Sequence, residues 1–140
     1  MIWGTFALAF AAAFTGASFY VNWVEQPARL KLEEAALLNE WGPSDSRGVF
    51  LLAALALLAA IAGFTAYFES QDVRWAFGAI LMILSWPYAF FIMSPLDNQI
   101  RSLRGSDVAA ARAFVRQWGL VESGLTAIGA VAALIFIWSH

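Results

Sequence analysis

Hydrophobic residues in this chain form four long runs that contain no charged side chain. The runs cover residues 1–24, 48–68, 75–96 and 123–140. Each has about the 17–25 residues that a helix needs to cross the hydrocarbon core of a membrane. None shows the apolar–polar alternation of β-barrel strands. The pattern therefore predicts four transmembrane helices, at about residues 2–26, 47–68, 73–94 and 107–139, within one domain of residues 1–140.

The composition agrees with a membrane protein and argues against several kinds of site. Hydrophobic residues make up 61% of the chain and charged residues 13%, which is about half of the charged share of a soluble domain. Cysteine is absent, and the single histidine is the last residue, His140. Without thiolates or a Glu-x-x-His pair, we expect no metal and no cofactor. No basic patch indicates nucleic acid as a partner.

Basic residues lie almost entirely in two of the three connections between the predicted helices. The connections after the first and third helices hold seven of the eight, and only Arg74 lies in the other connection. Because cytoplasmic loops are rich in Lys and Arg, we place both connections in the cytoplasm and both termini outside, as in a bacterial inner membrane. The seven residues are Arg29, Lys31, Arg47, Arg101, Arg104, Arg112 and Arg116.

The connection after the first helix has a helical pattern of its own. Four apolar residues between 30 and 41 share one face, which predicts a short amphipathic helix at the membrane surface. Gly42 and Pro43 predict a turn over residues 42–46 before the second helix begins. In the second connection, we expect a helix from residue 107 to run into the fourth transmembrane helix without a break.

The two halves of the chain share a weak repeat. Each has a proline, then an arginine, then a tryptophan–glycine pair: Pro27, Arg29 and Trp41 with Gly42 in the first half, Pro95, Arg101 and Trp118 with Gly119 in the second. We infer two helical hairpins related by a pseudo-two-fold axis along the membrane normal, in which Arg47 corresponds roughly to Glu122.

The first helix carries the strongest candidate site. Its polar residues recur at spacings of three and four, on one helical face, and they are Thr15, Ser18, Asn22, Glu25 and Arg29. Polar side chains within membrane helices usually face the bundle interior, and Glu122 lies at a similar depth. We therefore expect a buried site in which Glu25 or Glu122 accepts a proton. The alternative is an interfacial Glu25–Arg29 ion pair that reaches water.

Residues of the other helices could complete such a site. Tyr20, Trp86 and Tyr88 could stack on a flat ligand, or could only pack and anchor the helices at the membrane interface. Asn98 and Arg101 could close the cavity from the cytoplasmic side, or could only end a solvated helix.

Three stretches resemble a widespread family of small four-helix membrane proteins that includes the anthrone oxygenases. They are residues 20–29 (YVNWVEQPAR), residues 41–44 (WGPS) with 47–48 (RG), and residues 86–88 (WPY) with 95–98 (PLDN). The resemblance implies oxidation of an anthrone to an anthraquinone by molecular oxygen, without an evident cofactor. It departs at residues 118–124 (WGLVESG), which contain neither the His nor the Arg expected there.

Mapped onto this chain, the resemblance gives a role to five of the candidates. Glu25 would deprotonate a planar phenolic substrate, and Asn22 and Arg29 would hold the developing oxyanion. Trp86 and Tyr88 would stack on its rings. Because of the departure, the sequence leaves open whether the chain is an enzyme.

The sequence thus predicts an all-α integral membrane four-helix bundle with short interfacial amphipathic helices. It would bind a lipophilic aromatic or quinone-like molecule through Asn22, Glu25 and Arg29. The substrate-binding residues would be Tyr20, Arg47, Trp86, Tyr88, Asn98 and Glu122.

The competing hypothesis is a structural or accessory membrane protein. A homo-oligomer, for which small residues on the first and fourth helices are suited, is expected in either case, with membrane lipid as the surroundings. A cavity reaching Glu25 favours ligand binding. Direct Glu25–Arg29 and Glu122–Arg47 pairs without a void favour the accessory role.

Overall fold

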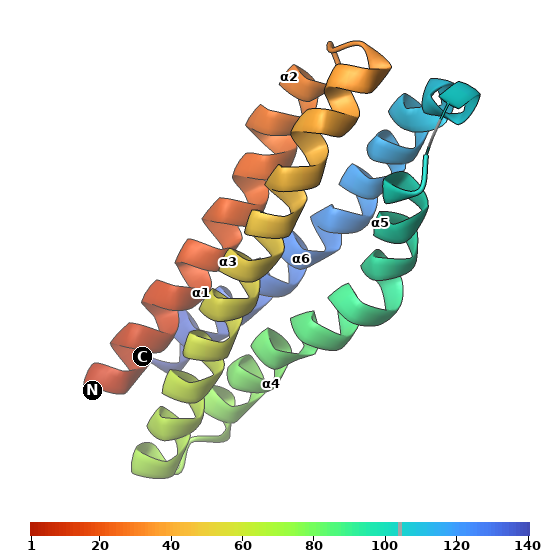
Figure 1. The fold of residues 1–140 in the computed structure, drawn as a ribbon. Coiled ribbons are helices and arrows are strands. Elements are labelled where there is room, and N and C mark those ends of the chain that lie inside the picture. Colours follow the sequence, from red (N-terminus) through yellow and green to blue (C-terminus); the bar gives the residue numbers. More distant parts are fainter. Residues whose placement is uncertain (104) are drawn as a thin grey trace.

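The computed structural model is an antiparallel bundle of four long helices (Figure 1). It describes residues 1–103 and 105–140, and of residues 105 and 106 only the backbone. Arg104, one of the residues behind the orientation prediction, lies outside the described residues. The elements are α1 (Ile2–Tyr20), η1 (Val21–Glu25), α2 (Gln26–Arg29), α3 (Glu34–Ser70), α4 (Val73–Tyr88), η2 (Ala89–Met93), α5 (Ser94–Arg101), η3 (Gly105–Ala110) and α6 (Ala111–Ser139).

The four helices form a ring in which each packs against two neighbours. Helix α1 packs on α3 and α6, and α4 packs on the same two helices. Both termini and the turn after α3 lie at one end of the bundle, whereas α2, α5 and the two longer connections lie at the other (Figure 1). We call this second end the connection end.

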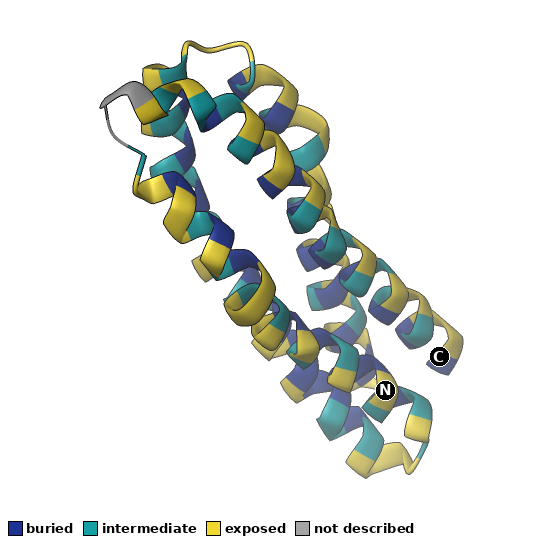
Figure 2. Cartoon of the chain, turned by 90° about the vertical axis from the view of Figure 1, so that its right-hand side faces the viewer, coloured by how far each residue is buried: buried dark blue, intermediate teal, exposed yellow. Residues whose placement is uncertain are grey.

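The described part of the chain contains four helices long and apolar enough to cross a membrane. They are Ile2–Arg29, Glu34–Ser70, Val73–Arg101 and Asp107–Ser139. Buried residues lie on the sides that face one another, and exposed residues cover the outside (Figure 2). The fourth span begins where the sequence predicted, as a 3₁₀ turn that continues into α6.

A π-helical turn precedes a proline in each half of the chain. Segment η1 lies just before Pro27, and η2 lies just before Pro95. Both prolines occupy the first turn of the α-helix that follows, where a missing N–H costs least. The first span therefore continues to Arg29 and the third to Arg101, so the prediction that they end near residues 26 and 94 is wrong.

These π turns change which residues face inward. A π turn bonds i to i+5 and so holds more residues than an α turn. The inward positions step from Ser18 to Gln26 across η1 and from Ser85 to Met93 across η2, eight residues in each case, whereas two α-helical turns would take about seven. The shared step supports the repeat inferred from the sequence.

The separate short helix and the turn predicted between residues 30 and 46 are wrong. Helix α3 begins at Glu34 and runs unbroken through the rest of this segment, with Pro43 inside it. Leu37, Trp41 and Asp45 are buried at a spacing of four on both sides of Pro43, so tertiary packing maintains one helical face across the proline. One carbonyl beside it, that of Gly42, accepts a hydrogen bond from Arg101 Nη2 at 3.3 Å.

The third span bends, as a proline within it suggested. Helix α4 contains Pro87 and passes directly into η2, and the ribbon changes direction between α4 and α5 (Figure 1). Prolines and π turns are both recognised causes of such bends.

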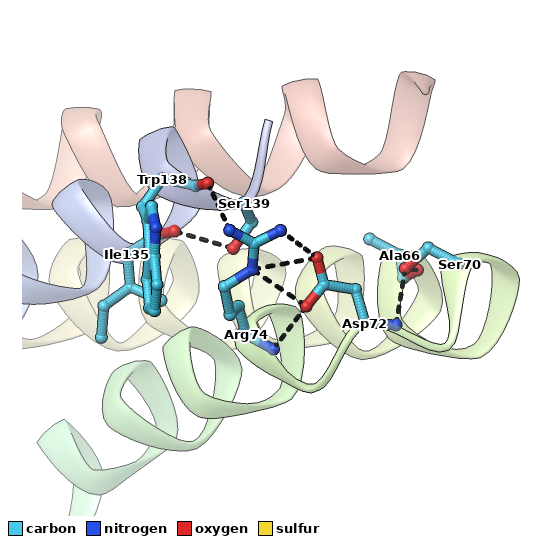
Figure 3. A network of polar contacts seen from close by, with 7 residues as sticks. All are labelled: Ala66, Ser70, Asp72, Arg74, Ile135, Trp138 and Ser139. Atoms are coloured by element: carbon cyan, nitrogen blue, oxygen red, sulfur yellow. Dashed lines mark hydrogen bonds and ion pairs between the residues drawn. The ribbon is translucent and has the colours of Figure 1, made fainter.

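At the opposite end, Asp72 and Arg74 connect the turn to the C-terminus (Figure 3). Asp72 accepts the Arg74 backbone N–H at 3.0 Å as the N-cap of α4, and it also pairs with the guanidinium at 2.6 Å. Arg74 Nη1 donates to the Trp138 carbonyl at 2.9 Å, which ties the end of α6 to this turn. The Arg74 hydrogen bonds lower the pKa of Asp72 below its usual value.

Candidate functional site

Two crossed tryptophans join the two halves of the chain at the connection end. The rings of Trp41 (α3) and Trp118 (α6) meet edge to face, 5.8 Å apart at 87°. Arg29 of the first half lies over Trp118 at 5.6 Å, and Arg101 of the second half lies over Trp41 at 5.0 Å. Each arginine thus packs on the tryptophan of the other half, which is the arrangement a pseudo-two-fold relation requires.

Arg29 is a buried charge held by two glutamates. Its side chain is 2% exposed, with Nη2 3.7 Å from Glu25 Oε1 and Nε 2.9 Å from Glu40 Oε2. Burying a guanidinium is costly unless carboxylates compensate it. Its Nη1 has no hydrogen-bond partner among the described residues, so one donor of the group remains available.

A second charge cluster forms around Asp45, which is itself buried. Asp45 Oδ2 lies 2.8 Å from Arg101 Nη2, which also donates to Ser46 Oγ at 3.0 Å. Asp97 of α5 lies beside Asp45, close enough for the two carboxyl groups to interact, and also near the indole of Trp118. The cluster joins α3, α5 and α6.

Glu122 of α6 is buried against the polar face of the first span. Its Oε1 accepts from Ser18 Oγ at 2.6 Å, and its Oε2 accepts from Asn22 Nδ2. The Ser18 hydroxyl is also 2.6 Å from Thr126 Oγ1. The predicted polar face therefore does point into the bundle, and two of its residues hold a carboxyl group from another helix.

A cavity of about 300 Å³ lies between these groups and is lined by residues of all four spans. Its inner part is mostly apolar, with Phe14, Leu52 and Leu125. Charged side chains line the part toward the connection end, namely Glu25, Arg29, Asp45, Asp97 and Glu122. The cavity is thus apolar at one end and ionic at the other, as is typical of sites for amphipathic small molecules.

The cavity also reaches the outer face of the bundle, between α3 and the α4–η2 segment. Val49, Trp86 and Phe90 line it and yet are 43%, 44% and 68% exposed. Trp86 Nε1 donates to the Ala53 carbonyl at 3.2 Å and so bridges the two helices at this edge.

The structure brings together four of the nine residues selected from the sequence. Glu25, Arg29, Trp86 and Glu122 line the cavity. Asn22 and Tyr88 are not among its lining residues. Asn22 donates to Glu122, and the Tyr88 hydroxyl donates to the Val121 carbonyl. These two side chains form hydrogen bonds with α6 next to the cavity and do not enter it.

The other three, Tyr20, Arg47 and Asn98, are exposed and are not among the residues that line the cavity. Arg47 points outward because α3 is continuous, which gives the inward position to Asp45, two residues earlier. The counterpart of Glu122 is likewise Asp45, since each follows the tryptophan of its half by four residues. The Glu122–Arg47 pair expected for an accessory protein does not form.

Sequence reasoning missed Asp45 and Asp97 as site residues. Asp45 lies within the turn predicted over residues 42–46, and Asp97 follows the predicted end of the third helix. The repeat contained a signal for Asp45, because aligning Trp41 with Trp118 pairs Asp45 with Glu122. No local pattern indicated Asp97, which faces inward only because η2 shifts the register of the residues after it.

Among the described residues no group of three or more His, Cys, Asp or Glu side chains is arranged to hold a metal ion. The cavity can instead enclose an apolar molecule and present carboxyl groups and one guanidinium to its polar end. No protein-family model matches the chain, and no match was found among curated proteins or solved structures.

Proposed function

We propose that the protein is an integral membrane protein that binds a lipophilic aromatic small molecule between its four spanning helices. Membrane insertion is supported by large apolar side chains on the outside of the bundle, such as Phe50 (78% exposed) and Leu120 (74%). In water, so much exposed apolar surface would drive association or aggregation, whereas lipid covers it without cost.

The observation that carries the binding proposal is the cavity. Its volume of about 300 Å³ is at the lower end of the range for small-molecule sites, which suits a ligand of two or three fused rings. Ionisable groups placed inside a membrane bundle are expensive and usually functional. An accessory protein has no need to keep such a void beside buried charges.

The opening beside Trp86 supports access from the lipid phase. A lipophilic ligand dissolves in the bilayer and can pass between α3 and η2 without crossing the ionic end of the cavity. Trp86 then lies at the edge of the route, where its ring can stack on an aromatic ligand.

The test is binding of anthrone to the protein in nanodiscs, measured by the quenching of tryptophan fluorescence. Gly48 lines the cavity, and a Cβ there would contact nothing within 4 Å. We therefore expect Gly48→Phe to fill the cavity without disturbing the fold and to abolish binding. Gly16→Phe is the matched control, since Gly16 has equally open surroundings outside the cavity. Equal binding by both variants would contradict the proposal.

A second candidate function, oxidation of an anthrone by molecular oxygen, is favoured by Glu25 and Arg29. Both line the cavity, and the free Arg29 Nη1 could stabilise an oxyanion formed when Glu25 removes a proton. Asn22 does not line the cavity, and its amide donates to Glu122 instead. We expect oxygen uptake with anthrone, lost in Glu25→Gln. Binding without oxygen uptake would leave a binding protein only.

A further inference from the structure

The charges that line the cavity do not balance. Four carboxyl side chains line it in the described structure, Glu25, Asp45, Asp97 and Glu122, against the single guanidinium of Arg29. Arg29 is already paired with Glu25 and Glu40. Arg101 pairs with Asp45 from outside the lining. The ionic end of the cavity is therefore lined by more acidic than basic side chains, and a cation placed there would be compensated.

The same end has buried acceptor atoms without a donor. Asp45 is 5% exposed, and its Oδ1 has no hydrogen-bond partner among the described residues. Oδ1 of the adjacent Asp97 has none either. A buried acceptor without a donor is unfavourable. The two oxygens belong to neighbouring carboxyl groups that both line the cavity, so one group placed there could satisfy both.

The chemistry of that group follows from the charges. A phenolate or carboxylate placed between Asp45 and Asp97 would be repelled by both. A neutral hydroxyl has one hydrogen to donate and leaves the negative charge uncompensated. A protonated amine carries several N–H donors and a positive charge, and charge-assisted hydrogen bonds of this kind are the strong ones.

We propose that the cavity selects lipophilic aromatic amines in their protonated form, with the ammonium group between Asp45 and Asp97 and the rings in the apolar part. This inference rests on the proposed function and specifies the ligand class of the same site. The rings would lie beside Phe14, Leu52 and Trp86, and Glu122 would add long-range attraction for the cation.

The experiment compares three probes with the same ring: 2-naphthylethylamine, 2-naphthylethanol and 2-naphthylacetate. Binding to the protein in nanodiscs at pH 7 is measured by calorimetry, with empty nanodiscs subtracted. We expect the amine to bind most tightly and the carboxylate least. Asp97→Asn should weaken amine binding by roughly tenfold or more and leave alcohol binding almost unchanged.

Asp97→Asn is the primary variant because it keeps the Asp45–Arg101 pair intact. Asp45→Asn should also weaken amine binding. Glu69→Gln, an exposed acidic position at the opposite end, is the control and should bind the amine normally. Thermal unfolding of each variant separates loss of binding from loss of the fold.

The outcomes separate the two proposals. Alcohol binding as tight as amine binding, with no effect of Asp97→Asn, would overturn the amine inference and leave an aromatic binding site. Failure of all three probes, together with failure of anthrone, in a folded protein would overturn both. Amine preference that is lost in Asp97→Asn supports both.

Discussion

At the residue scale, Glu122 shows how a buried acid can be both structural and available. Its two oxygens accept from Ser18 and Asn22 of the first span, and its side chain also lines the cavity. The hydrogen bonds fix the position of Glu122 and join α6 to α1. Glu25 is held less firmly, since its partner Arg29 lies 3.7 Å away and Glu25 is partly exposed.

We predict that Glu122→Leu destabilises the bundle even if ligand binding has no role. The substitution keeps the apolar bulk but removes the acceptor of the Asn22 amide and leaves the Ser18 hydroxyl with Thr126 as its only partner of the two. Each buried unsatisfied group costs about 1–3 kcal/mol, so the melting temperature in detergent should fall by several degrees. Ser123→Ala, at the neighbouring exposed position, is the control. An unchanged melting temperature in Glu122→Leu would show that these hydrogen bonds are not needed.

At the element scale, glycines let large aromatic side chains pack between helices. Gly78 of α4 lies under the ring of Phe136 of α6, which is fully buried and stacked on Trp75 at 5.6 Å. A Cβ at Gly78 would collide with that ring. The close approach of α4 and α6 at the terminal end therefore depends on the absence of a side chain there.

We predict that Gly78→Ala lowers stability and Gly16→Ala does not. The first forces a rigid ring to move in a packed interior, which costs about 1–3 kcal/mol, whereas the second places a methyl group in open space. Thermal unfolding of both variants in the same detergent measures the difference. Equal melting temperatures of the two variants would mean that α4 and α6 can move apart at this point without loss of stability.

At the scale of the whole molecule, the two hairpins face each other across Trp41 and Trp118, and the cavity lies between them. The ionic part of the cavity lies toward the connection end, where most of the basic residues also lie. If the basic connections are cytoplasmic, the polar end of the site is on the cytoplasmic side of the membrane.

This orientation can be measured, because the chain has no cysteine. We expect Ser102→Cys, in the second connection, to react with a membrane-impermeant maleimide only in inside-out vesicles. Glu69→Cys, at the opposite end, should react only in right-side-out vesicles. The reverse pattern would invert the orientation and place the polar end of the cavity outside.

Much of the fold could be predicted from the sequence because the hydrophobicity along the chain decides it. Charge-free runs long enough to span a bilayer fix the number of helices and their approximate positions. The inward direction of Ser18 and Asn22 followed in the same way, since polar groups avoid lipid. The sequence predicted breaks near Pro27, Pro43 and Pro95, but the helices continue past all three prolines. Tertiary packing and the π turns make this possible, and neither can be predicted from the local sequence.

The sequence by itself determined that four apolar helices form and that the first presents a polar face to the others. Both follow from local composition, because hydrophobicity and helical period are properties of adjacent residues. Only the tertiary structure decided which acids meet in the cavity. Asp45 and Asp97 face inward because α3 continues through Pro43 and because η2 rotates the residues after it. Their approach also depends on contacts between residues more than fifty positions apart, which no local pattern encodes.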